Sequence, residues 1–200
     1  MNTLKKLMKL FSIRAILYYL CTRFGSPRVR GWAFDRQCGK EYWDHLDKTH
    51  SATIANVVER YAKKGRILDL GCGTGSIASH LNLDSFESYL GVDVSPTGIT
   101  MAQKRKSEKI NFEIGDLQHY KCKEKYDLIV FEESLYYVPF FRQRLLRRYA
   151  QYLWPGGLFV VTIAHPNQFR GMIRMIRKNF QVIEDRFTSS SAGRLLLVFC

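Results

Sequence analysis

Three glycines spaced two residues apart, Gly71, Gly73 and Gly75, form the motif of this 200-residue chain that points most directly to chemistry. They follow a short apolar run that contains Asp69, in the stretch ILDLGCGTG. Glycine permits the tight turn that joins a strand to a helix, and it lets a ligand approach the backbone without meeting a Cβ atom. A dinucleotide-binding loop is the nearest alternative, but its third glycine comes one residue later, as G-x-G-x-x-G.

Two further acids stand where a nucleoside ligand would need hydrogen-bond acceptors. Asp93 follows the glycine loop at the expected carboxyl end of the next strand, and its carboxylate can accept two hydrogen bonds from a ribose diol. Asp116 follows the third expected strand and can accept from an exocyclic amine, whereas an Asp that only forms a turn is the plainer alternative. The carboxyl ends of parallel strands surround the crevice in which open α/β sheets bind ligands.

Strands and helices alternate from residue 65 onward. The apolar runs predict strands at 66–70, 88–94, 110–114, 126–132, 158–164, 180–187 and 194–199. The intervening segments predict helices at 75–81, 96–106, 140–153 and 167–178. Before them we expect helices at 4–22, 39–48 and 51–63, the last capped by Ser51, with a loop at 23–37. The alternation, closed by a hairpin, predicts a mostly parallel sheet with helices on both faces.

Taken together, these motifs resemble those of the class I S-adenosylmethionine-dependent methyltransferases. The resemblance covers about residues 42–200 and rests on GCGTG at 71–75, GVDVS at 91–95, GDL at 115–117, YDLIV at 126–130 and LWPGG at 153–157. It implies a Rossmann-like, doubly wound seven-stranded sheet in the order 3-2-1-4-5-7-6, with an antiparallel closing hairpin. It also implies a methyltransferase domain over 38–200, preceded by a basic amphipathic helix and lid loop over 1–37.

The resemblance implies S-adenosyl-L-methionine as the cofactor. Asp93 would hold the ribose, Asp116 the adenine amine, and Asp69 and Glu132 the methionine end. Tyr42 would reach the cofactor carboxylate from the lid. The cofactor-binding residues implied in this way are Asp69, Gly71, Gly73, Gly75, Asp93, Val94, Asp116, Leu117, Glu132 and Tyr42. The sequence contains no recognisable cluster of metal ligands, and we expect no metal.

The acceptor side follows the fourth expected strand, in the segment EESLYY. It lacks the N/D-P-P-Y/F tetrad of nucleobase N-methyltransferases and looks like methyltransferases that act on small molecules and sugars. Transfer to a hydroxyl needs a base within hydrogen-bond reach. His165, after the fifth strand, is the first candidate, with capping of the next helix as an equal alternative. Glu133 is the second candidate and His119 the third.

Three side chains are candidates for binding the acceptor. Tyr136 and Tyr137 either line its pocket or pack in the core. Arg142 lies within the apolar arc of its helix, where it either binds an anionic group of the acceptor or extends along the surface to reach water. The remaining histidines, His45, His50 and His80, are expected on helix surfaces.

Charge is concentrated at the start of the chain. The net charge is +13, and residues 1–30 hold seven bases and no acid. This segment is expected either to pack as a lid or to lie on an anionic membrane surface. Five cysteines without a C-x-x-C pair favour a reducing cytoplasm, with peripheral membrane attachment as the variant.

The favoured function is O-methylation of a small-molecule or glycan hydroxyl. An RNA or protein methyltransferase would suit the basic charge, but the absent base-gripping tetrad and the absent extra domain argue against nucleic acid. A non-catalytic, cofactor-binding partner subunit is the other alternative, since binding alone does not require turnover. The sequence does not specify the oligomeric state.

Overall fold

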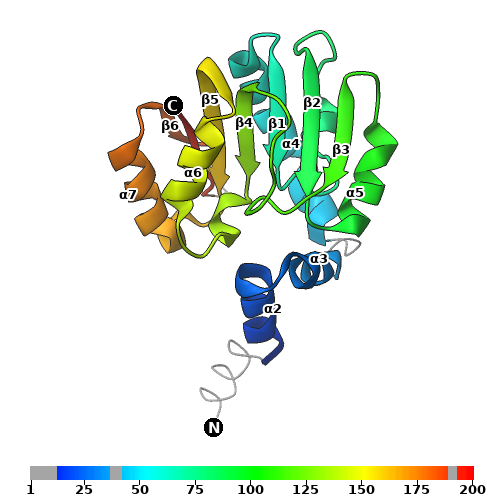
Figure 1. Cartoon of the computed structure of the whole chain (residues 1–200), viewed down its shortest axis with the longest axis vertical. Helices are drawn as coiled ribbons and strands as arrows, with labels where there is room; N and C mark the ends of the chain where they lie inside the picture. Colours follow the sequence, from blue (N-terminus) through cyan, green and yellow to red (C-terminus); the bar gives the residue numbers. More distant parts are fainter. Residues whose placement is uncertain (1–12, 37–41, 189–192) are drawn as a thin grey trace.

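Seven strands form one sheet in the order β3-β2-β1-β4-β5-β7-β6 (Figure 1). The computed structural model describes residues 13–36, 42–188 and 193–200, with side chains at 15–36, 50–188 and 193–200. All neighbours pair in parallel except β7, which is antiparallel to β5 and β6. The expected fold class and strand order are confirmed. The strands are β1 (Arg66–Leu70), β2 (Ser88–Asp93), β3 (Ile110–Ile114), β4 (Tyr126–Glu132), β5 (Leu153–Ile163), β6 (Val182–Phe187) and β7 (Leu195–Phe199).

Each face of the sheet carries its own apolar core, because strand side chains alternate between the two faces. On one face, Ile67, Leu128 and Val160 pack with buried residues of α4 (Tyr42–Ala62) and α5 (Pro96–Ala102). On the other face, Leu68 and Ile129 pack under α6 (Arg142–Ala150) and α7 (Arg170–Asn179). Short 3₁₀ turns lie between these elements, at η1 (Ala78–His80), η2 (Gln103–Arg105), η3 (Leu135–Tyr137) and η4 (Pro166–Phe169).

The direction of strand addition reverses between β1 and β4. The chain adds β2 and β3 on one side of β1 and then returns to pair β4 with its other side, with Ile67 opposite Leu128. Such a switch point opens a crevice at the carboxyl ends of the strands. Figure 1 places α2 (Ile13–Phe24) and α3 (Pro27–Asp35) beyond these ends, below the arrowheads of the strands. No helix in the described ranges is long and apolar enough to cross a membrane.

The prediction of a loop at 23–37 is wrong, because α3 occupies most of this segment. Ser26 is its N-cap and accepts a hydrogen bond from the Val29 N–H, and Pro27 takes the first position, where its missing N–H has no consequence. The helix expected at 4–22 is found as α2 from Ile13 onward, and its first residues lie outside the described part of the chain.

The break expected between two helices at 48–51 is also wrong, since α4 is continuous. Ser51 does not cap a helix: it is buried, and its hydroxyl donates to Ser76 Oγ at 3.1 Å. After the glycine loop the expected helix 75–81 is reduced to the short η1. The strand expected from 158 begins at Leu153, because the Trp-Pro-Gly-Gly turn lies inside β5, and the helix before it ends at Ala150.

Candidate active site

The glycine loop leaves β1 with three glycines at positive φ: +89° at Gly71, +55° at Gly73 and +79° at Gly75. This backbone conformation is costly for residues with a side chain. Nothing lies within 4 Å of the position that a Cβ atom would take at Gly73, so the loop presents bare backbone there. The space fits a ligand that approaches the main chain.

Asp93 ends β2 beside this loop and fixes its position. Its Oδ2 accepts the Gly73 N–H at 2.9 Å, and its Oδ1 accepts the Ser95 N–H at 2.8 Å. Burial raises the pKa of this carboxyl, and the two backbone donors act in the opposite direction. Each carboxylate oxygen has a second lone pair, so the role expected for Asp93 towards a ribose diol remains compatible with these bonds.

Asp69 is fully buried in β1 and only partly satisfied. The Tyr89 hydroxyl donates to its Oδ2 at 2.5 Å, whereas Oδ1 has no hydrogen-bond partner within the described residues. Burial, and next the charge of Asp93, raise the pKa of Asp69 to about 7. An ammonium or another donor brought by a ligand would satisfy this orphaned oxygen. That requirement fits the methionine end of S-adenosylmethionine.

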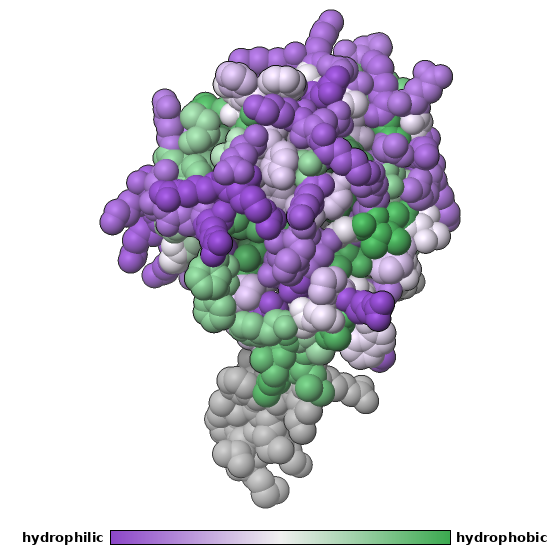
Figure 2. Space-filling view, viewed as in Figure 1, coloured by the Kyte–Doolittle hydropathy of each residue, from purple (hydrophilic) through white to green (hydrophobic). Residues whose placement is uncertain are grey.

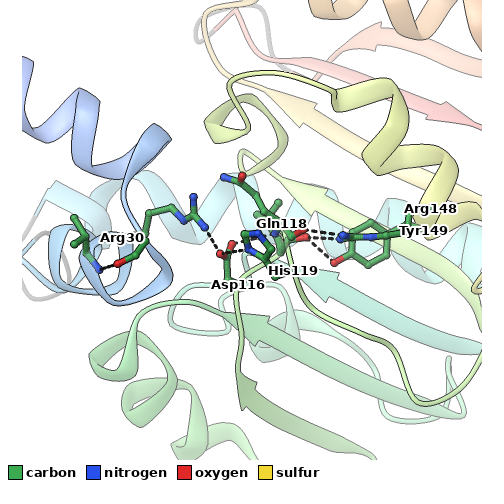
Figure 3. A network of polar contacts seen from close by, with 9 residues as sticks. Arg30, Asp116, Gln118, His119, Arg148 and Tyr149 are labelled. Atoms are coloured by element: carbon green, nitrogen blue, oxygen red, sulfur yellow. Dashed lines mark hydrogen bonds and ion pairs between the residues drawn. The ribbon is translucent and has the colours of Figure 1, made fainter.

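Asp116 lies at the centre of a polar network that joins three elements (Figure 3). Arg30 of α3 forms a buried ion pair with its Oδ2, and His119 Nδ1 lies 2.9 Å from the same oxygen. On the other side of the segment, Arg148 Nη2 and the Tyr149 hydroxyl donate to the Leu117 carbonyl at 3.1 and 2.7 Å. The segment expected to read adenine is therefore fixed by α3 from one side and by α6 from the other.

α3 is seated directly on the end of β2 and the start of α5. A Cβ atom at Gly31 would come within 2.6 Å of the Val94 carbonyl oxygen, so only glycine allows this approach. Asp35 Oδ1 accepts from the Ser95 hydroxyl at 2.5 Å and from the Thr97 N–H at 3.1 Å. The helix thus covers the strand ends that hold Asp93 and Asp116.

The acceptor side contains a cluster of ionisable groups at the carboxyl end of β4. His50 Nε2 lies 3.6 Å from Glu132 Oε1 and 3.9 Å from Glu133 Oε1. Arg194 Nε, next to β7, lies 2.6 Å from Glu133 Oε1, and the Tyr136 hydroxyl lies 3.4 Å from Oε2. We call His50, Glu132, Glu133 and Arg194 the acceptor cluster.

His50 is the unexpected member of this cluster. Its side chain is only 11% exposed, which corrects the expectation of a surface residue. Its Nε2 is buried and has no hydrogen-bond partner in the described part of the chain. Burial, and then the positive charge of Arg194, lower the pKa of His50 to about 4. Both effects favour the neutral form of the imidazole.

The other two candidate bases, His165 and His119, are exposed. His165 follows β5 at a left-handed φ of 52° and is exposed. His165 is the N-cap residue of η4, but its side chain makes no capping hydrogen bond. The alternative that His165 caps the following helix through its side chain is therefore not observed. His119 is 68% exposed beside Asp116. The side chain of Tyr42 lies outside the described residues.

The two tyrosines line the wall next to the acceptor cluster. Tyr136 stacks on Phe169 with ring centroids 4.6 Å apart, and Tyr137 meets Phe34 of α3 edge-on at 4.9 Å. Arg142 Nη2 donates to the Tyr136 carbonyl at 3.3 Å and reaches this wall, as does Arg23 Nη1 at 2.8 Å. Among the described residues, no group of three or more His, Cys, Asp or Glu is arranged to hold a metal ion.

Comparison with known proteins agrees with this architecture. Residues 42–195 match the family model described as a methyltransferase domain. The chain is 31% identical over 117 residues to malonyl-[acyl-carrier protein] O-methyltransferase of Bacillus cereus, covering 56% of this chain and 43% of that protein. It is 35% identical over 117 residues to the phthiotriol/phenolphthiotriol dimycocerosates methyltransferase of Mycobacterium leprae, covering 56% and 41%. The chain thus spans less than half the length of these two relatives.

Among solved structures, the N-methyltransferase NodS of Bradyrhizobium japonicum in complex with S-adenosyl-L-homocysteine has the same fold. Its TM-score is 0.69 at 20% identity, and the match covers 84% of this chain and 96% of that one.

Proposed function

Since the chain belongs to the methyltransferase-domain family, we propose that it transfers a methyl group from S-adenosylmethionine to a hydroxyl oxygen of a small-molecule or glycan acceptor. The bound cofactor supplies a methyl group on a positively charged sulfur. The glycine loop, Asp93 and Asp69 hold the cofactor: Asp93 accepts from the ribose hydroxyls, and Asp69 Oδ1 accepts from the ammonium. Alignment of the methyl group with the attacking oxygen supplies most of the rate.

The placement of His50 Nε2 beside Glu132 and Glu133, without a hydrogen-bond partner among the described residues, is the observation that carries the choice of a hydroxyl acceptor. A hydroxyl oxygen must lose its proton as it attacks, and a neutral base near the crevice can take it. His50 Nε2 is buried and lacks a hydrogen-bond partner within the described ranges, and the hydroxyl of an acceptor that enters the crevice would satisfy it. The carboxylates of Glu132 and Glu133, at 3.6 and 3.9 Å, stabilise the imidazolium that forms.

Glu133 serves as a positioning residue in this scheme. Arg194 Nε lies 2.6 Å from Glu133 Oε1. The backbone N–H of Glu133 donates to Thr162 Oγ1 at 3.0 Å. Its φ of 49° is unusual for a residue with a side chain, and this conformation directs the carboxylate toward His50. The O-methyl transfer in the name of the Bacillus cereus relative supports an oxygen acceptor.

Labelled-methyl transfer from S-adenosylmethionine over a panel of sugars, phenols, hydroxy acids, amines and RNA tests the proposal. We expect label in a methyl ether formed on a hydroxyl compound. His50→Gln should then lower kcat by ~10²–10⁴-fold, while the Kd for S-adenosylhomocysteine stays unchanged. His165→Gln is the matched control and should retain turnover.

Two results would overturn the assignment. Label that appears in amines or RNA and in no hydroxyl compound rejects the acceptor class. Equal turnover in wild type and His50→Gln, with loss in His165→Gln, returns the role of the base to His165.

A further inference from the structure

Exposed apolar side chains gather beyond the carboxyl ends of the strands, where α2 meets the segment before α6. Figure 2 shows green side chains gathered at this end of the molecule, whereas the rest of that face is largely purple. Phe141 is 77% exposed and Phe140 is 63% exposed. We call this surface the apolar rim; its members are Ile16, Leu17, Tyr19, Leu20, Phe24, Phe140 and Phe141.

The apolar rim is one surface and not scattered residues. The ring of Phe24 at the end of α2 lies 5.8 Å from that of Phe140, and 6.5 Å from that of Tyr19. Phe140 and Phe141 in turn have ring centroids 6.3 Å apart. A contiguous exposed patch of this kind on a folded domain marks an interaction surface.

Phe141 gives a second, independent indication. Its φ is +59°, a conformation that is costly for a bulky residue. Internal packing does not explain the conformation, because most of the ring is in contact with solvent. The strained backbone instead holds the ring outward at the tip of the apolar rim.

Two arginines lie within the apolar rim without acidic partners. Arg23 Nη1 and Arg142 Nη2 donate to the same carbonyl oxygen, that of Tyr136, at 2.8 and 3.3 Å. Neither forms an ion pair with an acid in the described part of the chain, and Arg142 Nε is buried without a hydrogen-bond partner there. Burial, followed by the charge of Arg23, lowers the pKa of Arg142. Two converging guanidinium groups that repel one another are matched by a phosphate placed between them.

The sequence before Asp35, the first acid of the chain, is basic: it contains Lys5, Lys6, Lys9 and Arg28. Bases flanking an apolar surface are attracted to anionic lipids, while the apolar side chains enter the boundary between headgroups and acyl chains.

We propose that the apolar rim, together with Arg23 and Arg142, docks this protein on the surface of a membrane that contains anionic phospholipid. The aromatic side chains enter the interface, and the two guanidinium groups bind lipid phosphate. Tyr136, whose carbonyl holds both arginines, also contacts Glu133 of the acceptor cluster through its hydroxyl. The docked surface is therefore the one on which the crevice opens.

Sedimentation of the full chain with sucrose-loaded vesicles measures this docking without any need for methyl transfer. We expect binding to vesicles of phosphatidylcholine mixed with phosphatidylglycerol at low salt, and much weaker binding to phosphatidylcholine alone. The double variant Phe140→Ser/Phe141→Ser should lose at least about tenfold in partition coefficient, because two aromatic side chains no longer enter the interface. Trp154→Ser is the matched control: this exposed aromatic contacts Lys125 at the opposite end of the sheet, and its loss should leave binding unchanged.

A second pair of variants tests the charges. Arg23→Gln/Arg142→Gln should lower the partition coefficient by about 25-fold, at roughly fivefold for each base. Arg147→Gln/Arg174→Gln removes the same charge from exposed positions on α6 and α7 and should have a much smaller effect. Thermal melts of all variants identify any loss that is due to unfolding.

Three outcomes overturn the proposal. The first is no sedimentation of the wild type with anionic vesicles at low salt. The second is equal loss of binding in the control variants and in the rim or arginine variants. The third is a dimer in analytical ultracentrifugation that Phe140→Ser/Phe141→Ser dissociates, with no vesicle binding, since a second copy then covers the apolar rim.

Discussion

Arg30 of α3 forms an ion pair with Asp116 at the carboxyl end of the sheet, although the two residues are 86 positions apart. Their side chains are only 7% and 6% exposed. Asp116 is the acid that the family resemblance assigns to the adenine amine. The resemblance therefore implies that one carboxylate both recognises the adenine and seats α3.

The first prediction concerns this pair. Arg30→Met leaves the Asp116 carboxylate buried without its countercharge, which should lower the free energy of unfolding by about 3–5 kcal/mol. Urea unfolding measures the change. Arg28→Met removes an exposed arginine from the same helix and should have little effect. Adding Asp116→Asn to Arg30→Met should restore part of the loss, and equal stability of the two single arginine variants would reject the buried pair.

The second prediction tests the contact between α3 and β2. Gly31→Ala places a Cβ atom within 2.6 Å of the Val94 carbonyl oxygen, so α3 must shift away from the strand ends. We expect a loss of about 1–3 kcal/mol in stability and weaker binding of S-adenosylhomocysteine. Gly171→Ala in α7 has open space around the new methyl group and should be neutral or stabilising by up to about 1 kcal/mol. Scanning and titration calorimetry measure the stability of both variants and their affinity for S-adenosylhomocysteine. A Gly31→Ala variant with unchanged stability and affinity would contradict the close seating of α3.

The third prediction concerns the ribose. Asp93→Asn removes a charged acceptor and should weaken binding of S-adenosylhomocysteine by ~1.5–3 kcal/mol, roughly ten- to a hundredfold. Isothermal titration calorimetry measures the affinity. Asp127→Asn is the control, because that carboxylate accepts the Arg66 N–H at the opposite end of the sheet. Unchanged affinity in Asp93→Asn would remove Asp93 from the cofactor site.

The fourth prediction is a pH dependence that arises from Asp69. Its pKa is raised to about 7 in the folded chain, so between about pH 4 and 7 the folded state holds a proton that the unfolded state has released. The contribution of Asp69 to the free energy of unfolding is therefore full at low pH and falls as the pH rises through 7. We expect wild type to lose on the order of 3 kcal/mol more than Asp69→Asn between pH 5 and pH 8, since about two pH units of that window lie below the folded pKa at about 1.4 kcal/mol each.

His50 makes the free energy of unfolding rise with pH in the acidic range, opposite to the effect of Asp69. It serves as the internal reference for that experiment. Its pKa is lowered to about 4, so stability falls as the pH drops below its unfolded value and the unfolded chain gains a proton. Because this effect is present in both wild type and Asp69→Asn, it cancels in their difference. Parallel pH profiles of the two proteins would show that Asp69 is not a protonated buried acid.

The sheet could be predicted from the sequence because its signals are local. The strands β1, β3 and β4 begin and end where their apolar runs do. The sequence does not predict α3, because Pro27 and Gly31 are residue types typical of loops. Pro27 in fact stands at the first helical position after the Ser26 cap, and Gly31 is required by contact with Val94. The cap could have been recognised from sequence, whereas the contact depends on tertiary packing.

The expected cofactor residues could be placed from the sequence, whereas the acceptor cluster could not. Asp93 and Asp116 follow strands directly, so strand prediction is enough to place them. The acceptor cluster brings together α4, the end of β4 and the start of β7, and no local pattern connects His50 or Arg194 with Glu133. His165 has a left-handed backbone after β5, and its side chain is exposed to solvent. The alternation of strand side chains between the two faces of a sheet does not predict this conformation.

The order of the last three strands in the sheet has a consequence for how the chain is made. β6 is synthesised before β7, yet β7 lies between β5 and β6, and β6 pairs with β7 alone in the described sheet. All five residues of β7 are buried, whereas β6 (VIEDRF) carries three charged side chains and is mostly exposed. Until β7 leaves the ribosome, β5 presents an open edge that includes Val160 and Val161. An open apolar edge is where unfinished chains pair with one another, and docking of the β6–β7 hairpin closes it.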